Sequence, residues 1–314
     1  MQNAMRKSWT RGSLTRFLTV SLKGISQVLL IENAVSGLLI LLAITTSSYL
    51  LGIMTLLSAF IGNIVGILGV ADEESLNQGL FGYNSVLTGI VLTLFLTGPY
   101  HWIIALIGAA IAAIFTAAMM HVSKELGIPV LTFPFIILSW LMLLASYRLK
   151  VFHLTPDLAP QNLLNWEVDM TGKVDWLEGT FNGIGQIFFL HNTLSGVLLF
   201  IAVFWAGWRF GLYVIIGNSV ALLTSYLLGG EPNLIFMGLY GYNAILTILA
   251  VSIVFDTKSN RFGLFLGIIG ACLTVLLTAS IATFLLPFGL PALTMPFVLS
   301  TWLLLGARKV LPRL

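Results

Sequence analysis

The chain has 314 residues, of which 58% are hydrophobic and 9% are charged. A soluble domain carries charge on about a quarter of its residues, so this composition excludes the soluble globular class. Such a chain can cover a surface that faces lipid, because the hydrocarbon core of a bilayer favours apolar side chains in every direction. The net charge of +3 comes without a basic stripe interleaved with aromatic residues, so no nucleic-acid partner is expected.

Apolar runs of about 20 residues, the length that crosses a bilayer, fall into two groups of five. The first group lies near 34–50, 52–70, 79–98, 102–121 and 129–147. After a polar stretch, the second group lies near 193–208, 210–228, 236–255, 262–285 and 291–307. The pattern predicts an all-α polytopic membrane protein with five spans on each side of a polar connector.

Three blocks of sequence occur twice and in the same order. They are 24–37 with 183–196 and 79–88 with 238–247, both at an offset of 159, and 127–135 with 289–297 at an offset of 162. Repeated Gly, Pro, Asn and Thr are not explained by general hydrophobicity, so the chain contains an internal duplication. Because each copy has an odd number of spans, the second enters the membrane from the opposite side, which gives two inverted repeats.

The predicted organisation has four parts. They are a cytoplasmic N-terminal segment (1–16), a first repeat (17–148), an extracytoplasmic connector (149–180) and a second repeat (181–314). With the N-terminus inside, this topology places twelve Lys and Arg residues in the cytoplasm and only Arg148, Lys150 and Lys173 outside. We therefore expect both termini in the cytoplasm, at a plasma membrane or a bacterial inner membrane.

The first block of each repeat is too short or too interrupted to be an ordinary span, because it contains Gln27 or Gln186. It is better interpreted as a re-entrant helix that enters half of the membrane. Such elements are tolerated only where protein or a water-filled cavity surrounds them. Inverted repeats place them at the pseudo-two-fold axis, where substrate sites form.

The polar residues inside the spans are mostly neutral and recur at equivalent positions. They are Gln27 and Gln186, Asn33 and Asn192, Asn84 and Asn243, Thr88 and Thr247, and Thr132 and Thr294. A symmetric set of amides and hydroxyls suits an uncharged solute that forms hydrogen bonds. Such residues also simply join helices. We favour helix capping or joining for the asparagines and function for the glutamines, and the Thr132/Thr294 pair is open between the two.

Glu32 is the one plausible coupling carboxylate in the spans, and its counterpart in the other half is His191. The two side chains are expected to face each other across the pseudo-symmetry axis. Helix capping at an interface is favoured there over a proton relay.

The doubled pattern G-I-x-Q-[VI], N-x-x-S-G, then G-L-x-G-Y-N-x-x-L-T, then L-T-x-P-F resembles the urea transporter family. The likeness covers nearly the whole chain. It implies a homotrimer in which each protomer has its own channel-like pore between its two inverted halves. Urea would pass down its concentration gradient without a coupling ion. The family commonly has Asn-Pro where this chain has Asn33-Ala34 and Asn192-Thr193.

The resemblance also implies which residues line the pore. Gln27 and Gln186 would contribute to a ladder of oxygens, and Thr132 and Thr294 would mark the narrow midpoint. The side chains that would flatten the pore into a slot are Val28, Leu30, Ile187 and Phe189, opposed by Tyr83 and Leu87 and by Tyr242 and Leu246. Each Tyr lies four residues before its Leu and hence on the same helical face.

Three alternatives remain. The first is a channel for another small neutral solute, such as ammonia, water or a short amide. The second is an ion-coupled secondary transporter, which would depend on Glu32 and on a proton or sodium gradient. The third is an intramembrane enzyme, but the spans contain no nucleophile, base or metal ligands within reach of one another. No catalytic activity and no cofactor is expected.

Overall fold

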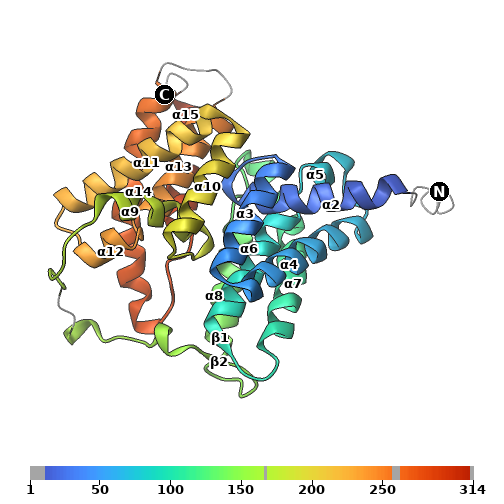
Figure 1. Ribbon diagram of the computed structural model, residues 1–314, viewed down its shortest axis with the longest axis horizontal. Coiled ribbons are helices and arrows are strands. Elements are labelled where there is room, and N and C mark those ends of the chain that lie inside the picture. Colours follow the sequence, from blue (N-terminus) through green and yellow to red (C-terminus); the bar gives the residue numbers. More distant parts are fainter. Residues whose placement is uncertain (1–10, 166–167, 257–261, 312–314) are drawn as a thin grey trace.

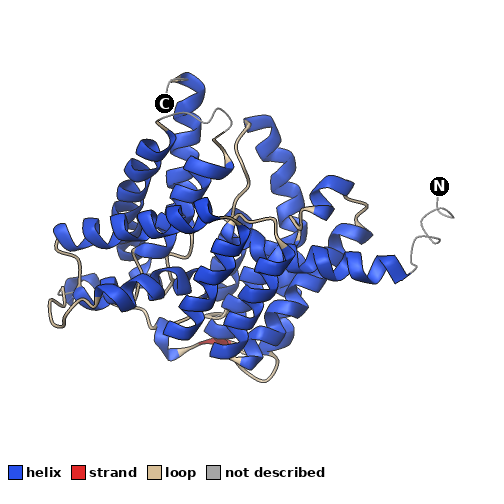
Figure 2. Ribbon diagram, turned by 45° about the horizontal axis from the view of Figure 1, so that its top comes forward, coloured by secondary structure: helices blue, strands red, loops and turns tan. Residues whose placement is uncertain are grey.

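The computed structural model describes residues 11–165, 168–256 and 262–311. Within these ranges the protein is helical apart from loops and one pair of two-residue strands (Figure 2). The predicted N-terminal segment 1–16 lies largely outside the described residues. Figure 1 shows the two halves of the chain side by side, the first in blue and green and the second in yellow to red, joined by a connector along the bottom.

The two halves contain corresponding helices in the same order. The first consists of α2 (Arg11–Ser26), η1 (Gln27–Leu29), α3 (Ala34–Ser47), α4 (Tyr49–Leu68), α5 (Glu73–Asn77), α6 (Gly82–Phe95), α7 (His101–Leu126) and α8 (Phe133–Ala145). The second consists of α9 (Trp176–Gly185), η4 (Gln186–Phe188), α10 (Thr193–Ala206), α11 (Trp208–Leu227), α12 (Pro232–Phe236), α13 (Gly241–Leu249), the π-helical turn η5 (Ala250–Val254), α14 (Gly263–Leu285), η6 (Leu286–Phe288) and α15 (Met295–Val310). The duplicated, all-helical architecture is therefore confirmed.

The connector between the halves contains short elements only. They are β2 (His153–Leu154) and the 3-10 turns η2 (Pro156–Leu158) and η3 (Leu163–Asn165). Strand β2 pairs antiparallel with β1 (Leu96–Thr97), which lies between α6 and α7 in the first half. The backbone N–H of Gln161 donates to the carbonyl of Leu286, at 3.2 Å. The connector is thereby tied to both halves.

Each half begins with a sharply bent pair of helices. The axis turns by 74° between the segment Leu14–Leu29 and α3, and by 76° between Trp176–Phe188 and α10. At each bend a residue other than glycine adopts the left-handed backbone conformation. These residues are Leu30, with φ 59°, and Phe189, with φ 60°. Each pair is a broken helix of the kind expected for a re-entrant element.

The helices differ in length more than the hydropathy runs suggest. Four are long and apolar enough to cross a bilayer alone, namely α4, α7, α11 and α14 with η6, and the bent pairs bring the described total to six. In contrast, α6 and α8 have 14 and 13 residues although their apolar runs are longer. In α8, Pro134 fixes the helix start because proline favours the first turn and restricts the residue before it.

Hydrogen bonds between the halves show their pseudo-two-fold relation. In α3, Ser36 Oγ donates to the carbonyl of Ala202 in α10 at 2.8 Å, and in α10, Ser195 Oγ donates to the carbonyl of Ala43 in α3 at 2.9 Å. Ser36 and Ser195, like Ala43 and Ala202, are separated by the sequence offset of 159. A reciprocal contact of this kind is what a two-fold interface requires.

A second reciprocal pair follows the other offset. Trp140 Nε1 in α8 donates to the carbonyl of Pro291 at 2.9 Å, and Trp302 Nε1 in α15 donates to the carbonyl of Pro129 at 2.7 Å. Both donors and both acceptors are 162 residues apart. The two halves are thus locked together at two places by the same interaction made twice.

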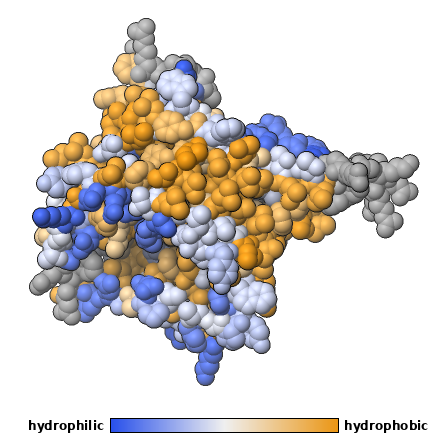
Figure 3. All heavy atoms as spheres, viewed as in Figure 1, coloured by the Kyte–Doolittle hydropathy of each residue, from blue (hydrophilic) through white to orange (hydrophobic). Residues whose placement is uncertain are grey.

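Apolar residues fill the inside of the protein and also cover its outside. A single buried hydrophobic cluster runs through both halves and contains Ile25, Leu87, Ile184 and Leu246. Many large apolar side chains are exposed as well, and Figure 3 shows them over much of one face, with hydrophilic residues gathered towards its left, lower and upper right edges. An apolar exterior of this extent fits a multi-pass membrane protein.

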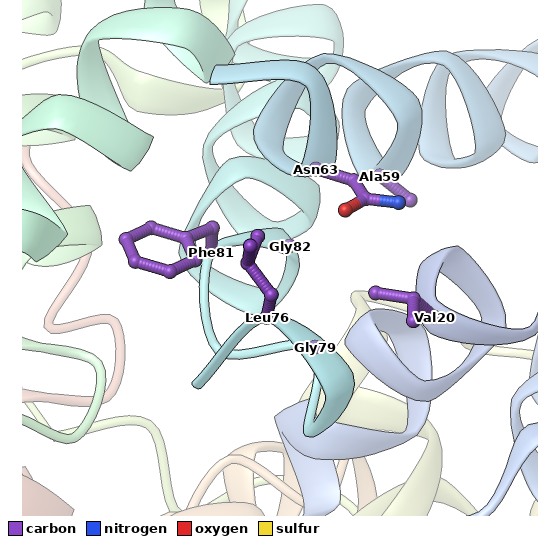
Figure 4. Close-up of a pocket in the computed structure, with 7 residues that line it drawn as sticks. All are labelled: Val20, Ala59, Asn63, Leu76, Gly79, Phe81 and Gly82. Carbon is purple, nitrogen blue, oxygen red and sulfur yellow. The ribbon is translucent and has the colours of Figure 1, made fainter. Parts of the chain in front are cut away.

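Glycine contacts hold each re-entrant helix against the rest of its half. A Cβ on Gly82 would lie 3.0 Å from Gly24 Cα, and a Cβ on Gly241 would lie 3.2 Å from Gly183 Cα. Beside the first contact, α2, α4 and the turn before α6 surround a pocket with about 170 Å³ of empty space, too narrow for a water molecule (Figure 4). Asn63 borders it and donates to Ser21 Oγ at 3.3 Å. This pocket is a packing gap.

We expect Gly79→Ala to lower the melting temperature in detergent more than Gly229→Ala does. Both glycines are left-handed, with φ 78° and 73°, so both variants bear a backbone cost of about 1–2 kcal/mol. A Cβ on Gly79 would also lie 2.5 Å from the backbone nitrogen of Gly24, whereas a Cβ on Gly229 meets nothing within 4 Å. The clash adds about 1–3 kcal/mol. Equal shifts in a thermal unfolding assay would contradict the proposed packing role of Gly79.

Candidate functional site

The two predicted glutamines occupy equivalent places at the inner ends of the re-entrant helices. Gln27 begins η1, and its Nε2 donates to the carbonyl of Gln78 at 3.0 Å. Gln186 begins η4, and its Nε2 donates to the carbonyl of Met237 at 3.0 Å. A carbonyl acceptor fixes the orientation of an amide, because the flipped amide would place two oxygens together. Neither side-chain oxygen accepts a hydrogen bond from any described residue.

The environments of the two glutamines differ. Gln186 Nε2 lies 2.9 Å from His191 Nδ1, so the imidazole nitrogen accepts the second amide hydrogen of Gln186. In the first half, Glu32 stands in the position of His191 and forms an ion pair with Lys23 at 2.7 Å. Glu32 and His191 therefore each have a partner within their own half, and their facing each other across the axis stays a prediction.

The predicted slot residues flank the glutamines. Val28 and Ile187 are buried, and Leu30 and Phe189 pack as partly buried residues against the same cluster. Phe189 also meets Phe95, at the end of α6, edge to face with ring centroids 5.8 Å apart. Apolar and aromatic side chains thus surround the place where the amide oxygens are free.

The predicted residues of α6 and α13 belong to that cluster too. Leu87 and Leu246 are 1% and 0% exposed, and Tyr83 and Tyr242 are 7% and 8% exposed. The phenol oxygen of each tyrosine is already engaged. Tyr83 donates to the carbonyl of Leu131 and Tyr242 to the carbonyl of Leu293, both at 2.6 Å. The tyrosine rings are therefore held by bonds to the segments that precede α8 and α15.

The predicted midpoint threonines meet each other directly. Thr132 Oγ1 and Thr294 Oγ1 are 2.6 Å apart, and both residues are buried. Each is the N-cap residue of its helix, α8 or α15, but neither side chain caps the helix. Residues that bond to their own counterparts lie on the pseudo-two-fold axis. One hydrogen joins the pair, which leaves one hydroxyl hydrogen and several lone pairs for another molecule.

The asparagines have two different roles. Asn33 accepts from the N–H groups of Val35 and Ser36, and Asn192 accepts from that of Leu194, so both are helix N-caps as favoured above. Asn84 and Asn243 lie inside α6 and α13 and do not cap them.

Instead, the Nδ2 atoms of Asn84 and Asn243 donate to the carbonyls of Leu131 and Leu293, at 3.4 Å and 3.1 Å. The Oδ1 atoms of both asparagines are buried without a hydrogen-bond partner among the described residues. Both side chains therefore act as donors, and Asn84 Nδ2 also donates to Thr116 Oγ1 in α7, at 2.9 Å.

Sequence reasoning missed two groups of residues around the site. Trp140 and Trp302 join the halves next to the threonine pair, and their common offset of 162 was a signal that could have found them. The partnership of Gln186 with His191 has no equivalent in the first half, so the repeat gave no signal for it.

These contacts give the arrangement a simple form. A threonine pair lies on the axis, one glutamine lies in each half, and buried apolar side chains surround all four. The side chains of Gln27, Gln186, Thr132 and Thr294 are all neutral. Such a set can exchange hydrogen bonds with a small neutral molecule, and it offers nothing to stabilise a bare ion.

The sequence resembles known transporters over most of its length. The sequence model of the family described as "UT: Urea transporter" matches residues 18–309. "Urea transporter 1" of Ovis aries is 28% identical over 302 residues, covering 92% of this chain and 77% of the sheep protein. "Urea transporter 1" of Rattus norvegicus is 26% identical with the same coverage. The duplicated fold, the paired site and this match agree: the chain belongs to the urea transporter family.

Proposed function

We propose that this protein conducts urea passively across a membrane, down the concentration gradient of urea. The observation that carries the proposal is the pairing of neutral groups about the axis. Gln27 and Gln186 keep their side-chain oxygens free, and Thr132 and Thr294 meet between the two halves. Membership of the urea transporter family and the relatives named Urea transporter 1 support the same substrate.

Urea fits this site because it is flat and neutral, with four N–H donors and one carbonyl acceptor. A glutamine oxygen can accept from the N–H groups of urea at each side of the midpoint, and the threonine hydroxyls can serve both kinds of group. Hydrogen bonds to water are then replaced one step at a time. Several shallow sites in series allow fast exit, as conduction requires.

Ions are opposed by two features of the same region. The slot residues Val28, Leu30, Ile187 and Phe189 offer no polar atom to replace lost hydration. In addition, the N-termini of α8 and α15 meet at the threonine pair. Helix N-termini carry partial positive charge, so cations are disfavoured at the midpoint.

The ion-coupled alternative depends on Glu32, and the structure gives that carboxylate another role. Glu32 pairs with Lys23 at the surface, with side-chain exposures of 45% and 23%. A coupling carboxylate would be expected at the axis and free to bind its ion. The alternative that the protein carries another small neutral solute is tested by comparing the flux of urea with the fluxes of other solutes.

In this proposal the protein works as a homotrimer with one pore per protomer, and both termini lie in the cytoplasm.

We expect purified protein in liposomes to carry urea at a rate that an imposed proton or sodium gradient does not change. Stopped-flow light scattering measures the flux, with empty liposomes as the baseline. Glu32→Gln should retain urea flux, because Glu32 forms a surface ion pair with Lys23 and is not part of the threonine pair at the midpoint. Flux at the empty-liposome baseline would reject urea as the solute. Flux that requires a gradient and Glu32 would reject the passive mechanism.

We also expect Gln27→Leu and Gln186→Leu to lower urea flux by about threefold to tenfold each, the effect of losing one net hydrogen bond of about 0.5–1.5 kcal/mol. Leucine keeps the size of the side chain and removes its oxygen. Gln161→Leu, in the exposed connector, is the matched control and should leave flux unchanged. Wild-type flux in both inner variants would show that the glutamine oxygens do not contact the solute.

A further inference from the structure

The segments before the two midpoint threonines have an unusual backbone. Leu131 has φ 52° and Leu293 has φ 50°, and both are left-handed leucines directly before Thr132 and Thr294. This conformation is unfavourable for a residue with a Cβ, so it persists only where the surroundings impose it. Two equivalent residues with the same strained backbone indicate that something equivalent holds each of them.

Two donors on one carbonyl supply that constraint in the first half. The carbonyl oxygen of Leu131 accepts from Tyr83 OH at 2.6 Å and, over a longer distance of 3.4 Å, from Asn84 Nδ2, which also donates to Thr116 Oγ1 at 2.9 Å. A carbonyl oxygen has two lone pairs, so the pair of donors saturates it. The Leu131 carbonyl belongs to the same planar peptide as the Thr132 nitrogen. Fixing that oxygen therefore fixes the plane from which Thr132 starts.

The second half repeats the arrangement more tightly. The carbonyl of Leu293 accepts from Tyr242 OH at 2.6 Å and from Asn243 Nδ2 at 3.1 Å. In both halves the donors are consecutive residues at the start of the helix packed behind the threonine, α6 or α13. A long phenol and a short amide can reach one oxygen from neighbouring positions, although their side chains leave the helix in different directions.

The surroundings of the asparagine oxygens indicate that the Nδ2 end of each amide, and not the Oδ1 end, makes the hydrogen bond to the leucine carbonyl. Asn84 Oδ1 and Asn243 Oδ1 are buried and have no hydrogen-bond partner among the described residues. An unsatisfied buried acceptor is costly, so an amide at this place contributes through its N–H groups. Exchanging the two ends of the amide would set Oδ1 against the leucine carbonyl. The geometry therefore favours the donor role in both halves.

We propose that Tyr83 with Asn84, and Tyr242 with Asn243, are positioning residues that aim Thr132 and Thr294 at each other by clamping the preceding leucine carbonyls. The role of the clamp in conduction rests on the proposed urea transport, but its role in alignment does not. The tyrosine hydroxyls act through the threonines and are themselves bonded to protein. The rings of the same tyrosines remain free to line the slot.

Disulfide cross-linking tests the alignment without any transport assay. Thr132→Cys and Thr294→Cys are combined with Cys272→Ser, because Cys272 is the single native cysteine. The rate of intrachain disulfide formation with a mild oxidant is measured by gel mobility and mass spectrometry. Adding Tyr83→Phe or Tyr242→Phe should each lower that rate by about threefold to tenfold, the effect of one lost hydrogen bond, and adding both should lower it further. An unchanged rate would overturn the proposal.

Tyr147→Phe is the matched control for that experiment. Tyr147 OH also donates to a backbone carbonyl, that of Phe288, at 3.0 Å, but it does so at the surface and away from the threonine pair. This variant should leave the cross-linking rate unchanged. A fall as large as that in the Tyr83/Tyr242 variant would mean that general loosening causes the effect, and the proposal would be rejected.

A double-mutant cycle tests the consequence for conduction. Urea flux, and its ratio to N-methylurea flux, are measured in Tyr83→Phe, Thr132→Val and the combined variant. If Tyr83 acts through Thr132, Tyr83→Phe lowers flux and changes the ratio in the native background but adds little to Thr132→Val. Equal factors in both backgrounds would show that the hydroxyl acts independently, against the proposal. A wild type without urea flux rejects the urea assignment alone, because cross-linking still decides the alignment.

Discussion

The fold depends on hydrogen bonds to the backbone N–H and C=O groups that are left unpaired where a helix is broken. Inside a membrane, water does not reach these groups. Four left-handed residues, Leu30, Phe189, Leu131 and Leu293, interrupt the helices around the site. Each interruption is enclosed by protein, and its polar groups bond to side chains or caps from the same half. Because a lipid-exposed break would be prohibitively costly, the broken helices must face the axis. The position of the site follows from that requirement.

Because the two halves are related by a pseudo-two-fold axis, both contain the same arrangement of side chains, and the proposed pathway has two similar ends. Reciprocal bonds from Ser36 and Ser195 and from Trp140 and Trp302 hold the halves in register. This alignment of the two halves brings Thr132 into hydrogen-bond contact with Thr294, and each half contributes one glutamine. In the proposed pathway, a solute that moves from either side meets the same order of groups, which suits transport in either direction down a gradient.

The symmetry is not complete, and the differences lie beside the glutamines. In the first half, Lys23 and Glu32 neutralise each other and leave Gln27 with one backbone partner. In the second half, His191 accepts the remaining amide hydrogen of Gln186, which holds that amide more firmly. Both halves thus have a glutamine with a free side-chain oxygen, but the hydrogen bonds that hold the amide nitrogen differ. The central pair and the apolar walls are unaffected, because they belong to elements that the two halves share.

The sequence alone determined the class of the protein, its duplication and the identity of its recurrent polar residues. Composition and spacing suffice for these, since few charges and a fixed offset between repeated blocks leave little choice of architecture. Only the tertiary structure decided the partners. It paired Glu32 with Lys23 and His191 with Gln186, assigned Asn33 and Asn192 to caps but Asn84 and Asn243 to leucine carbonyls, and joined Thr132 to Thr294. A hydrogen bond between residues up to 173 positions apart depends on how helices pack, and local pattern carries no information about that distance.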